Sequence, residues 1–157
     1  MKARKIVLTM ALCVIGFGVC FAQKSEKALM GTWKLNEAKS KLAPGAAKNH
    51  TVVYEAAGDD VKVTVEGTDA SGNPTHSEWT GKFDGKDYPL TGDPMADFRS
   101  YTQVNDRTLS LNNKKDGKTI VTGKIVVSKD GKTRTLTTHG KDANGKKMSS
   151  TAVYDKQ

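Results

Sequence analysis

The sequence predicts an all-β protein, a single antiparallel up-and-down β-barrel of about 8–10 strands with at most one short helix near residues 37–43. Val61, Val63 and Val65 alternate with polar residues, which is the two-residue period of a strand with one buried face. Asp-Gly and Asn-Gly pairs recur between such runs, and they supply the positive φ angles that tight hairpin turns need. Because the connections are short throughout, a meander that closes on itself is favoured over a Greek-key sandwich.

Turn residues divide the chain from Gly31 onward into about ten expected strands. These cover residues 31–36, 49–57, 60–69, 75–83, 86–90, 97–104, 107–113, 118–128, 132–140 and 147–155. The one helical candidate is 36–48, which Pro44-Gly45 interrupts after about two turns. Closure of the barrel requires the first strand to pair with the last.

Residues 1–22 have the three parts of a secretory signal peptide. Lys2, Arg4 and Lys5 form a positive start, an apolar run follows from residue 6 to residue 19, and Ala22 ends a small-residue cleavage site. The apolar run is shorter than the roughly 20 residues that span a bilayer. We therefore expect an exported protein, periplasmic or secreted, that begins near Gln23 and has no stable membrane insertion.

Cleavage would remove Cys13 and Cys20, the two cysteines of the chain, so residues 23–157 would form one domain without disulfides or thiolate metal ligands. Residues 1–22 hold three of the 25 basic residues and none of the 17 acidic ones, which leaves a net charge of +5. The excess lysines are scattered over turns, where they act as solubility devices. No basic stripe with interleaved aromatic residues is visible, so we expect no nucleic-acid partner.

The two ends of this domain resemble one protein superfamily. Gly31-Thr32-Trp33-Lys34-Leu35 resembles the opening strand of the calycins, the group of lipocalins and fatty-acid-binding proteins. Thr151-Ala152-Val153-Tyr154-Asp155 is similar to the closing Thr-Arg-x-Tyr-Glu strand of fatty-acid-binding proteins. With Asn36 and Ala38-Lys39-Ser40-Lys41 added, the opening is more similar to small exported bacterial proteins with a lipocalin-like domain. The resemblance implies a lipocalin-like barrel over 23–157 that binds lipids or other small ligands.

Two departures from the fatty-acid-binding pattern stand out. The arginine that holds the lipid carboxylate in that family is Ala152 here, although the partner tyrosine is present as Tyr154. The helical lid that follows the first strand in that family is reduced to the short 36–48 segment. Carboxylate binding by the family's own arrangement is therefore not expected.

The resemblance assigns structural roles to Trp33 and Lys156. Trp33 is expected to plug one end of the barrel, with Lys156 over its ring in a cation–π contact. Truncation of Trp33 is expected to damage stability more than ligand binding.

Strand alternation identifies six candidate ligand-binding residues. They are Tyr54, Trp79, Arg134, Tyr154, Tyr101 and Arg99. Tyr54, Trp79, Arg134 and Tyr154 are expected to line one continuous cavity beside Ala152, with Arg134 orienting an anionic or carbonyl head group. The parity of the strand at 97–104 leaves open whether Arg99 faces inward, and for each arginine taken alone a surface position is favoured. A narrow barrel filled by these side chains remains the alternative.

Neither metal binding nor catalysis is indicated. The histidines, His50, His76 and His139, lack the spacing of a zinc pair. No nucleophile elbow and no Ser-His-Asp order is recognisable, and the glycine-rich turns are not phosphate loops. We expect no cofactor and no enzyme.

Three functional hypotheses follow from the sequence. The first is a monomeric, non-catalytic envelope barrel that binds a small apolar or amphipathic ligand. The second is a protein-interaction barrel, such as a hydrolase or protease inhibitor that uses residues 23–30 as a trunk. The third is a structural envelope protein without a ligand. Ligand identity, protein partner and oligomeric state are not encoded in a recognisable motif.

Overall fold

The computed structural model describes residues 26–141 and 145–157, and within them the chain forms ten β-strands and one 3-10 helix. The expected signal segment 1–22 and the turn residue Asn144 lie outside the described residues. The strands are β1 (Gly31–Leu35), β2 (Lys48–Ala57), β3 (Asp60–Thr68), β4 (Pro74–Gly81), β5 (Tyr88–Thr91), β6 (Phe98–Asn105), β7 (Thr108–Lys115), β8 (Lys118–Val127), β9 (Thr133–Lys141) and β10 (Lys147–Lys156).

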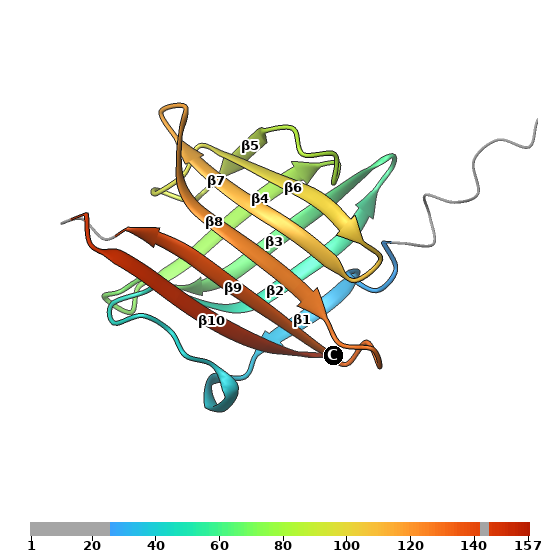
Figure 1. The fold of residues 1–157 in the computed structure, drawn as a ribbon, viewed down its shortest axis with the longest axis horizontal. Coiled ribbons are helices and arrows are strands. Elements are labelled where there is room, and N and C mark those ends of the chain that lie inside the picture. The colour runs from blue at the N-terminus through green and yellow to red at the C-terminus, as the bar shows by residue number, and fades with distance from the viewer. Residues whose placement is uncertain (1–25, 142–144) are drawn as a thin grey trace, which may run out of the picture.

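Each strand pairs antiparallel with its neighbours in sequence, and the sheet closes into a barrel through β1 and β10. Trp33 lies opposite Lys156, and Leu35 lies opposite Tyr154. Figure 1 shows β1 and β10 side by side, so the two ends of the folded chain meet in the barrel wall. The predicted fold class and the predicted closure are confirmed.

The hairpin turns follow from local sequence. Lys115 pairs with Lys118 around Asp116 and Gly117, whose φ angles are 49° and 73°. Two consecutive positive φ values define the turn that matches the twist of a two-residue hairpin, and Asp-Gly adopts it at low cost. The same chemistry explains why the strand boundaries could be predicted closely.

The expectation of at most one short helix near 37–43 is confirmed, since the described chain forms one 3-10 turn there, η1 (Glu37–Lys39). Asn36 caps this turn by accepting a hydrogen bond from the Lys39 amide, and Ser40 already has an extended backbone. Lys41 then pairs with Thr151 of β10, with N···O distances of 2.7 and 2.8 Å. Pairing with the sheet satisfies the backbone here, so the helix does not continue.

Valine, leucine and aromatic side chains fill the barrel core. Val61, Val63 and Val65 of β3 are buried on one face, as their alternation predicted. Leu109 and Leu111 of β7 and Ile125 of β8 continue this core. Among the described residues, no helix is long and apolar enough to cross a membrane.

Candidate functional site

The barrel interior contains a cluster of aromatic rings contributed by several strands. Trp79 of β4 lies 4.8 Å from the ring centre of Tyr101 on β6 and 6.2 Å from that of Phe83. Tyr54 of β2 approaches Tyr101 at 6.4 Å. The Trp79 indole donates a hydrogen bond of 2.9 Å to the backbone carbonyl of Arg99. These stacked, tilted and edge-to-face contacts fill this part of the barrel with protein atoms.

Arg134 of β9 places a guanidinium group in the interior. Its side chain is 1% exposed, and its Cζ lies 4.3 Å from the ring centre of Tyr154, 5.3 Å from that of Tyr54 and 5.8 Å from that of Trp33. Nε and Nη1 have no hydrogen-bond partner. No ion pair to Arg134 occurs in the described part of the chain, so three ring faces surround a positive charge that lacks a counterion.

Trp33 of β1 packs against the residues that precede this strand. Trp33 is fully buried, and its indole N–H donates a 2.9 Å hydrogen bond to the carbonyl of Leu29. Leu29 is also fully buried. The expected Lys156 contact is present, with Nζ 5.0 Å from the Trp33 ring centre. Leu29, which belongs to the suggested trunk 23–30, is therefore part of the core, and residues 23–25 of that segment lie outside the described residues.

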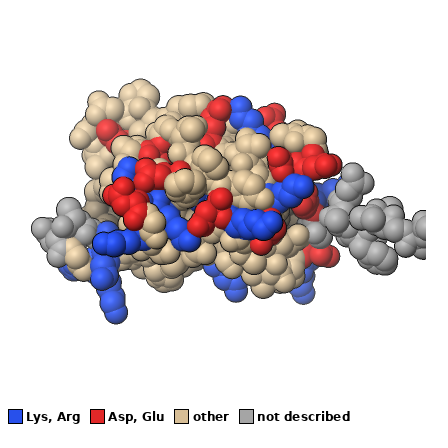
Figure 2. All heavy atoms as spheres, turned by 90° about the horizontal axis from the view of Figure 1, so that it is seen from above, with Lys and Arg blue, Asp and Glu red and all other residues tan. Residues whose placement is uncertain are grey.

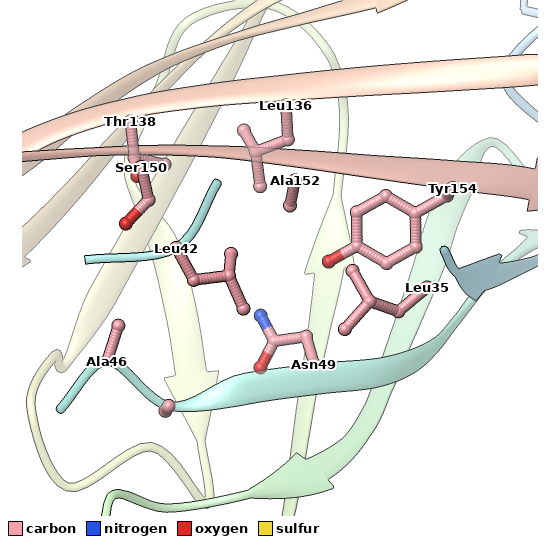
Figure 3. Close-up of a pocket in the computed structure, with 10 residues that line it drawn as sticks. Leu35, Leu42, Ala46, Asn49, Leu136, Thr138, Ser150, Ala152 and Tyr154 are labelled. Atoms are coloured by element: carbon pink, nitrogen blue, oxygen red, sulfur yellow. The ribbon is translucent and has the colours of Figure 1, made fainter. Parts of the chain in front are cut away.

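A cavity of about 130 Å³ lies under the segment that connects β1 to β2 (Figure 3). Its lining is Leu35, Leu42, Ala46, Ala47, Asn49, Leu136, Thr138, Ser150, Ala152 and Tyr154. Figure 3 shows the Tyr154 hydroxyl and the Asn49 amide directed into this space, with Leu42 and Ala46 on the covering segment. Apolar walls with a few converging polar groups are typical of small-molecule sites.

Hydrogen bonds to β10 hold this covering segment, residues 40–47, in place. The Ser40 hydroxyl accepts a 2.9 Å bond from the Val153 amide and donates a 2.7 Å bond to the Asn36 carbonyl. The Ala43 amide donates to the Ser150 hydroxyl at 2.9 Å. The cover is thus fixed along one edge by the strand that contributes Ala152 and Tyr154 to the cavity.

All six predicted ligand-binding residues are buried in the barrel. A surface position for Arg99 and Arg134 is therefore wrong. Arg99 Nε donates to Asn113 at 2.8 Å, and its Nη2 lies 3.9 Å from Asp93, so polar partners compensate its burial. Phe98 is 41% exposed, because the inward face of β6 is taken by Arg99 and Tyr101.

The continuous cavity expected along Tyr54, Trp79, Arg134 and Tyr154 is not present in that form. Of these four, only Tyr154 lines the cavity, since the ring contacts described above occupy the space between the others. The predicted space beside Ala152 and Tyr154 is real. Leu42, Ala46 and Ala47 escaped the sequence analysis because an irregular segment has no periodic pattern to assign its faces.

Burial raises the pKa of the Tyr154 phenol, while the charge of Arg134 and a hydrogen bond from it act in the opposite direction. Burial likewise raises the pKa of Tyr54. Both phenols are therefore protonated at neutral pH and can donate hydrogen bonds.

The outer surface carries mixed charge. Figure 2 shows lysine and arginine interspersed with aspartate and glutamate on one face. His76 of β4 pairs with Glu66 of β3 at 2.6 Å, and His50 approaches the Thr68 hydroxyl at 3.1 Å. The described residues include no group of three or more His, Cys, Asp or Glu side chains that could hold a metal ion.

No protein-family model and no curated protein sequence matches this chain. Among solved structures, the chain is similar to EF1p2_mFAP2b bound to DFHBI, with a TM-score of 0.51 and 13% identity over 85% of this chain and 98% of that one. It is also similar to a redesigned β-barrel, mFAP1, bound to DFHBI, with a TM-score of 0.46 and 16% identity over 85% and 99% of the two chains. The likeness to the first of these structures concerns the fold alone, a closed antiparallel β-barrel.

Proposed function

We propose that this protein is an exported, non-catalytic barrel that binds a small apolar or amphipathic molecule in the cell envelope. The observation that carries the proposal is the cavity of about 130 Å³ between β10 and the covering segment. Leu35, Leu42 and Leu136 would bury the apolar part of the ligand, and Asn49 and Tyr154 would bind its polar end. Such a combination of apolar walls and few polar groups gives both affinity and orientation.

The barrel architecture supports this proposal. EF1p2_mFAP2b, which shares the overall fold at a TM-score of 0.51, was solved with the small molecule DFHBI bound. A small antiparallel barrel can therefore accommodate a compact ligand. The volume of the cavity is similar to the roughly 150 Å³ of an engineered cavity in another protein that binds benzene.

Export is proposed from the first residues of the chain. The positive start, the apolar run and the small residues before Gln23 have the pattern of a cleaved signal peptide. The lack of cysteine after residue 22 is compatible with an oxidising compartment, because the folded domain needs no reduced thiol.

The interaction-module hypothesis has less support from the surface. Four large apolar side chains are exposed among the described residues: Met95, Phe98, Val104 and Val126. Phe98 begins β6 and Val104 lies near its opposite end, so these two do not form one patch. Singly exposed apolar residues are ordinary on protein surfaces.

Titration with ethylbenzene, followed by two-dimensional NMR, tests the proposed site. Saturable shifts are expected at the amides of Asn49, Ala152 and Tyr154. Ala152→Phe should abolish these shifts by filling the cavity, whereas Ala57→Phe, on an exposed part of β2, should leave them unchanged. A folded wild-type protein without shifts at these amides would refute the proposal.

A further inference from the structure

Arg134 is an unusual residue for a barrel interior. Its side chain is 1% exposed, and two of its three guanidinium nitrogens lack a hydrogen-bond partner. Removing an arginine charge from water without a counterion costs several kcal/mol, which the faces of three rings offset only in part. By contrast Arg99, the other buried arginine in the described residues, has Asn113 and Asp93 beside it.

Tyr154 connects this charge to the cavity. The Arg134 guanidinium lies over the Tyr154 ring at 4.3 Å, while the hydroxyl of the same tyrosine is directed into the cavity (Figure 3). Burial raises the pKa of this phenol, so at neutral pH it keeps the proton that it can donate to a ligand. Its cationic neighbour makes the phenol a stronger donor, because the charge stabilises negative charge that develops on the phenol oxygen.

Asn49 supplies a second polar group at the same place. Its side-chain amide is directed toward the Tyr154 hydroxyl side of the cavity in Figure 3. Two converging hydrogen-bond donors suit a carboxylate group, because each of its two oxygens can accept a hydrogen bond. No acidic side chain lines this cavity, so nothing in its lining opposes a negative ligand.

The volume restricts the apolar part of the ligand. About 130 Å³ accommodates one aromatic ring or a short alkyl chain, and the aromatic cluster of Trp79, Phe83 and Tyr101 occupies further interior space. A long acyl chain exceeds the volume of this cavity.

We propose that the cavity selects compact carboxylates, with the Tyr154 hydroxyl and the Asn49 amide as hydrogen-bond donors and Arg134 behind Tyr154 as the fixed counter-charge. This rests on the proposed function and adds the charge and the size of the ligand. In this arrangement Arg134 is a positioning and electrostatic residue that does not itself line the cavity.

The test compares benzoate with benzamide, which have nearly the same shape and differ in charge. NMR titration of the purified protein at neutral pH should show about tenfold tighter binding of benzoate, equivalent to about 1.4 kcal/mol. Arg134→Met should remove this preference while benzamide still binds, and palmitate should not compete with benzoate. Lys156→Met is the matched control, since it removes a positive charge near the same Trp33 ring and should keep the preference.

The outcomes separate the two proposals. Binding of both ligands with equal affinity, or an unchanged preference in Arg134→Met, would overturn carboxylate selection and leave the binding function intact. Competition by palmitate would overturn the size limit. Failure of ethylbenzene, benzoate and benzamide alike to bind a folded protein would overturn the proposed function itself. Melting curves of each variant establish that it is folded.

Discussion

The guanidinium carbon of Arg134 lies 4.3 Å from the centre of the Tyr154 ring, and the two residues are directly opposite each other on β9 and β10. The antiparallel register creates this relationship, because opposite residues in a ladder project to the same face of the sheet. Tyr154 is also part of the cavity wall. A buried charge and a binding cavity therefore share one side chain.

Arg134→Met is expected to leave the free energy of unfolding unchanged or to raise it by about 1–4 kcal/mol. The reason is that an apolar side chain of similar length avoids the desolvation cost of a buried charge without a counterion. Equilibrium denaturation in urea measures the effect. A decrease of more than about 2 kcal/mol in the free energy of unfolding would mean that the ring contacts stabilise the protein by more than the burial of the charge destabilises it. Arg134 would then be explained by stability alone.

Trp33→Ala is expected to lower the free energy of unfolding by about 3–5 kcal/mol, because it leaves a cavity at a fully buried position. It also removes the hydrogen bond to the Leu29 carbonyl, so the segment before β1 should loosen. Thermal unfolding followed by circular dichroism measures the loss, and Trp33→Phe, which keeps most of the ring, should cost less. An unchanged melting temperature in Trp33→Ala would contradict the assignment of Trp33 as the plug of the barrel.

Sequence patterns predicted the barrel well because every strand has a local signal. Val61, Val63 and Val65 specify one buried face of β3, and the Asp-Gly pair at 116–117 specifies a hairpin. Short turns left few topologies to consider, so closure through β1 and β10 could be expected before the pairing was seen. These are short-range properties of the chain.

The site depends on longer-range properties. Alternation placed Arg134 among the candidate ligand-binding residues, yet a charged side chain alone favours solvent. Only the surrounding rings of Trp33, Tyr54 and Tyr154 make its burial tolerable. The cavity is bounded by an irregular segment held by side-chain hydrogen bonds to β10. No local pattern encodes such contacts between residues more than 100 positions apart.

His76 should titrate above the ordinary histidine range. The hydrogen bond that the His76 ring donates to the Glu66 carboxylate is the main cause of its raised pKa, with the charges of Glu66 and Glu78 adding to it. Because the folded-state pKa is the higher one, the pair contributes stability below the unfolded pKa and loses it as the pH rises through the folded pKa. NMR titration of the His76 ring in wild type and in Glu66→Gln measures this, and equal midpoints would show that Glu66 does not hold the proton.

The exported protein should begin at or near Gln23. Signal peptidases cleave after small residues that follow an apolar run, and Ala22 occupies that position. N-terminal sequencing and intact mass measurement of the protein from the envelope fraction test this expectation. Retention of residues 1–22, or a lipid attached to Cys20, would contradict it.

Ser40→Ala should loosen the cover of the cavity with only a modest effect on the barrel. The substitution removes the acceptor for the Val153 amide and the donor to the Asn36 carbonyl, and each hydrogen bond of this kind contributes about 0.5–1.5 kcal/mol. Native-state hydrogen exchange should therefore accelerate at Val153 and Thr151, whereas amides of β6 and β7 stay protected. Ser71→Ala, in an exposed turn between β3 and β4, is the matched control and should change neither set.

Because the cover is fixed to β10 along this edge, ethylbenzene should also enter and leave the Ser40→Ala protein faster. Equal exchange rates at Val153 in the two variants would show that the Lys41–Thr151 pairing alone holds the cover closed.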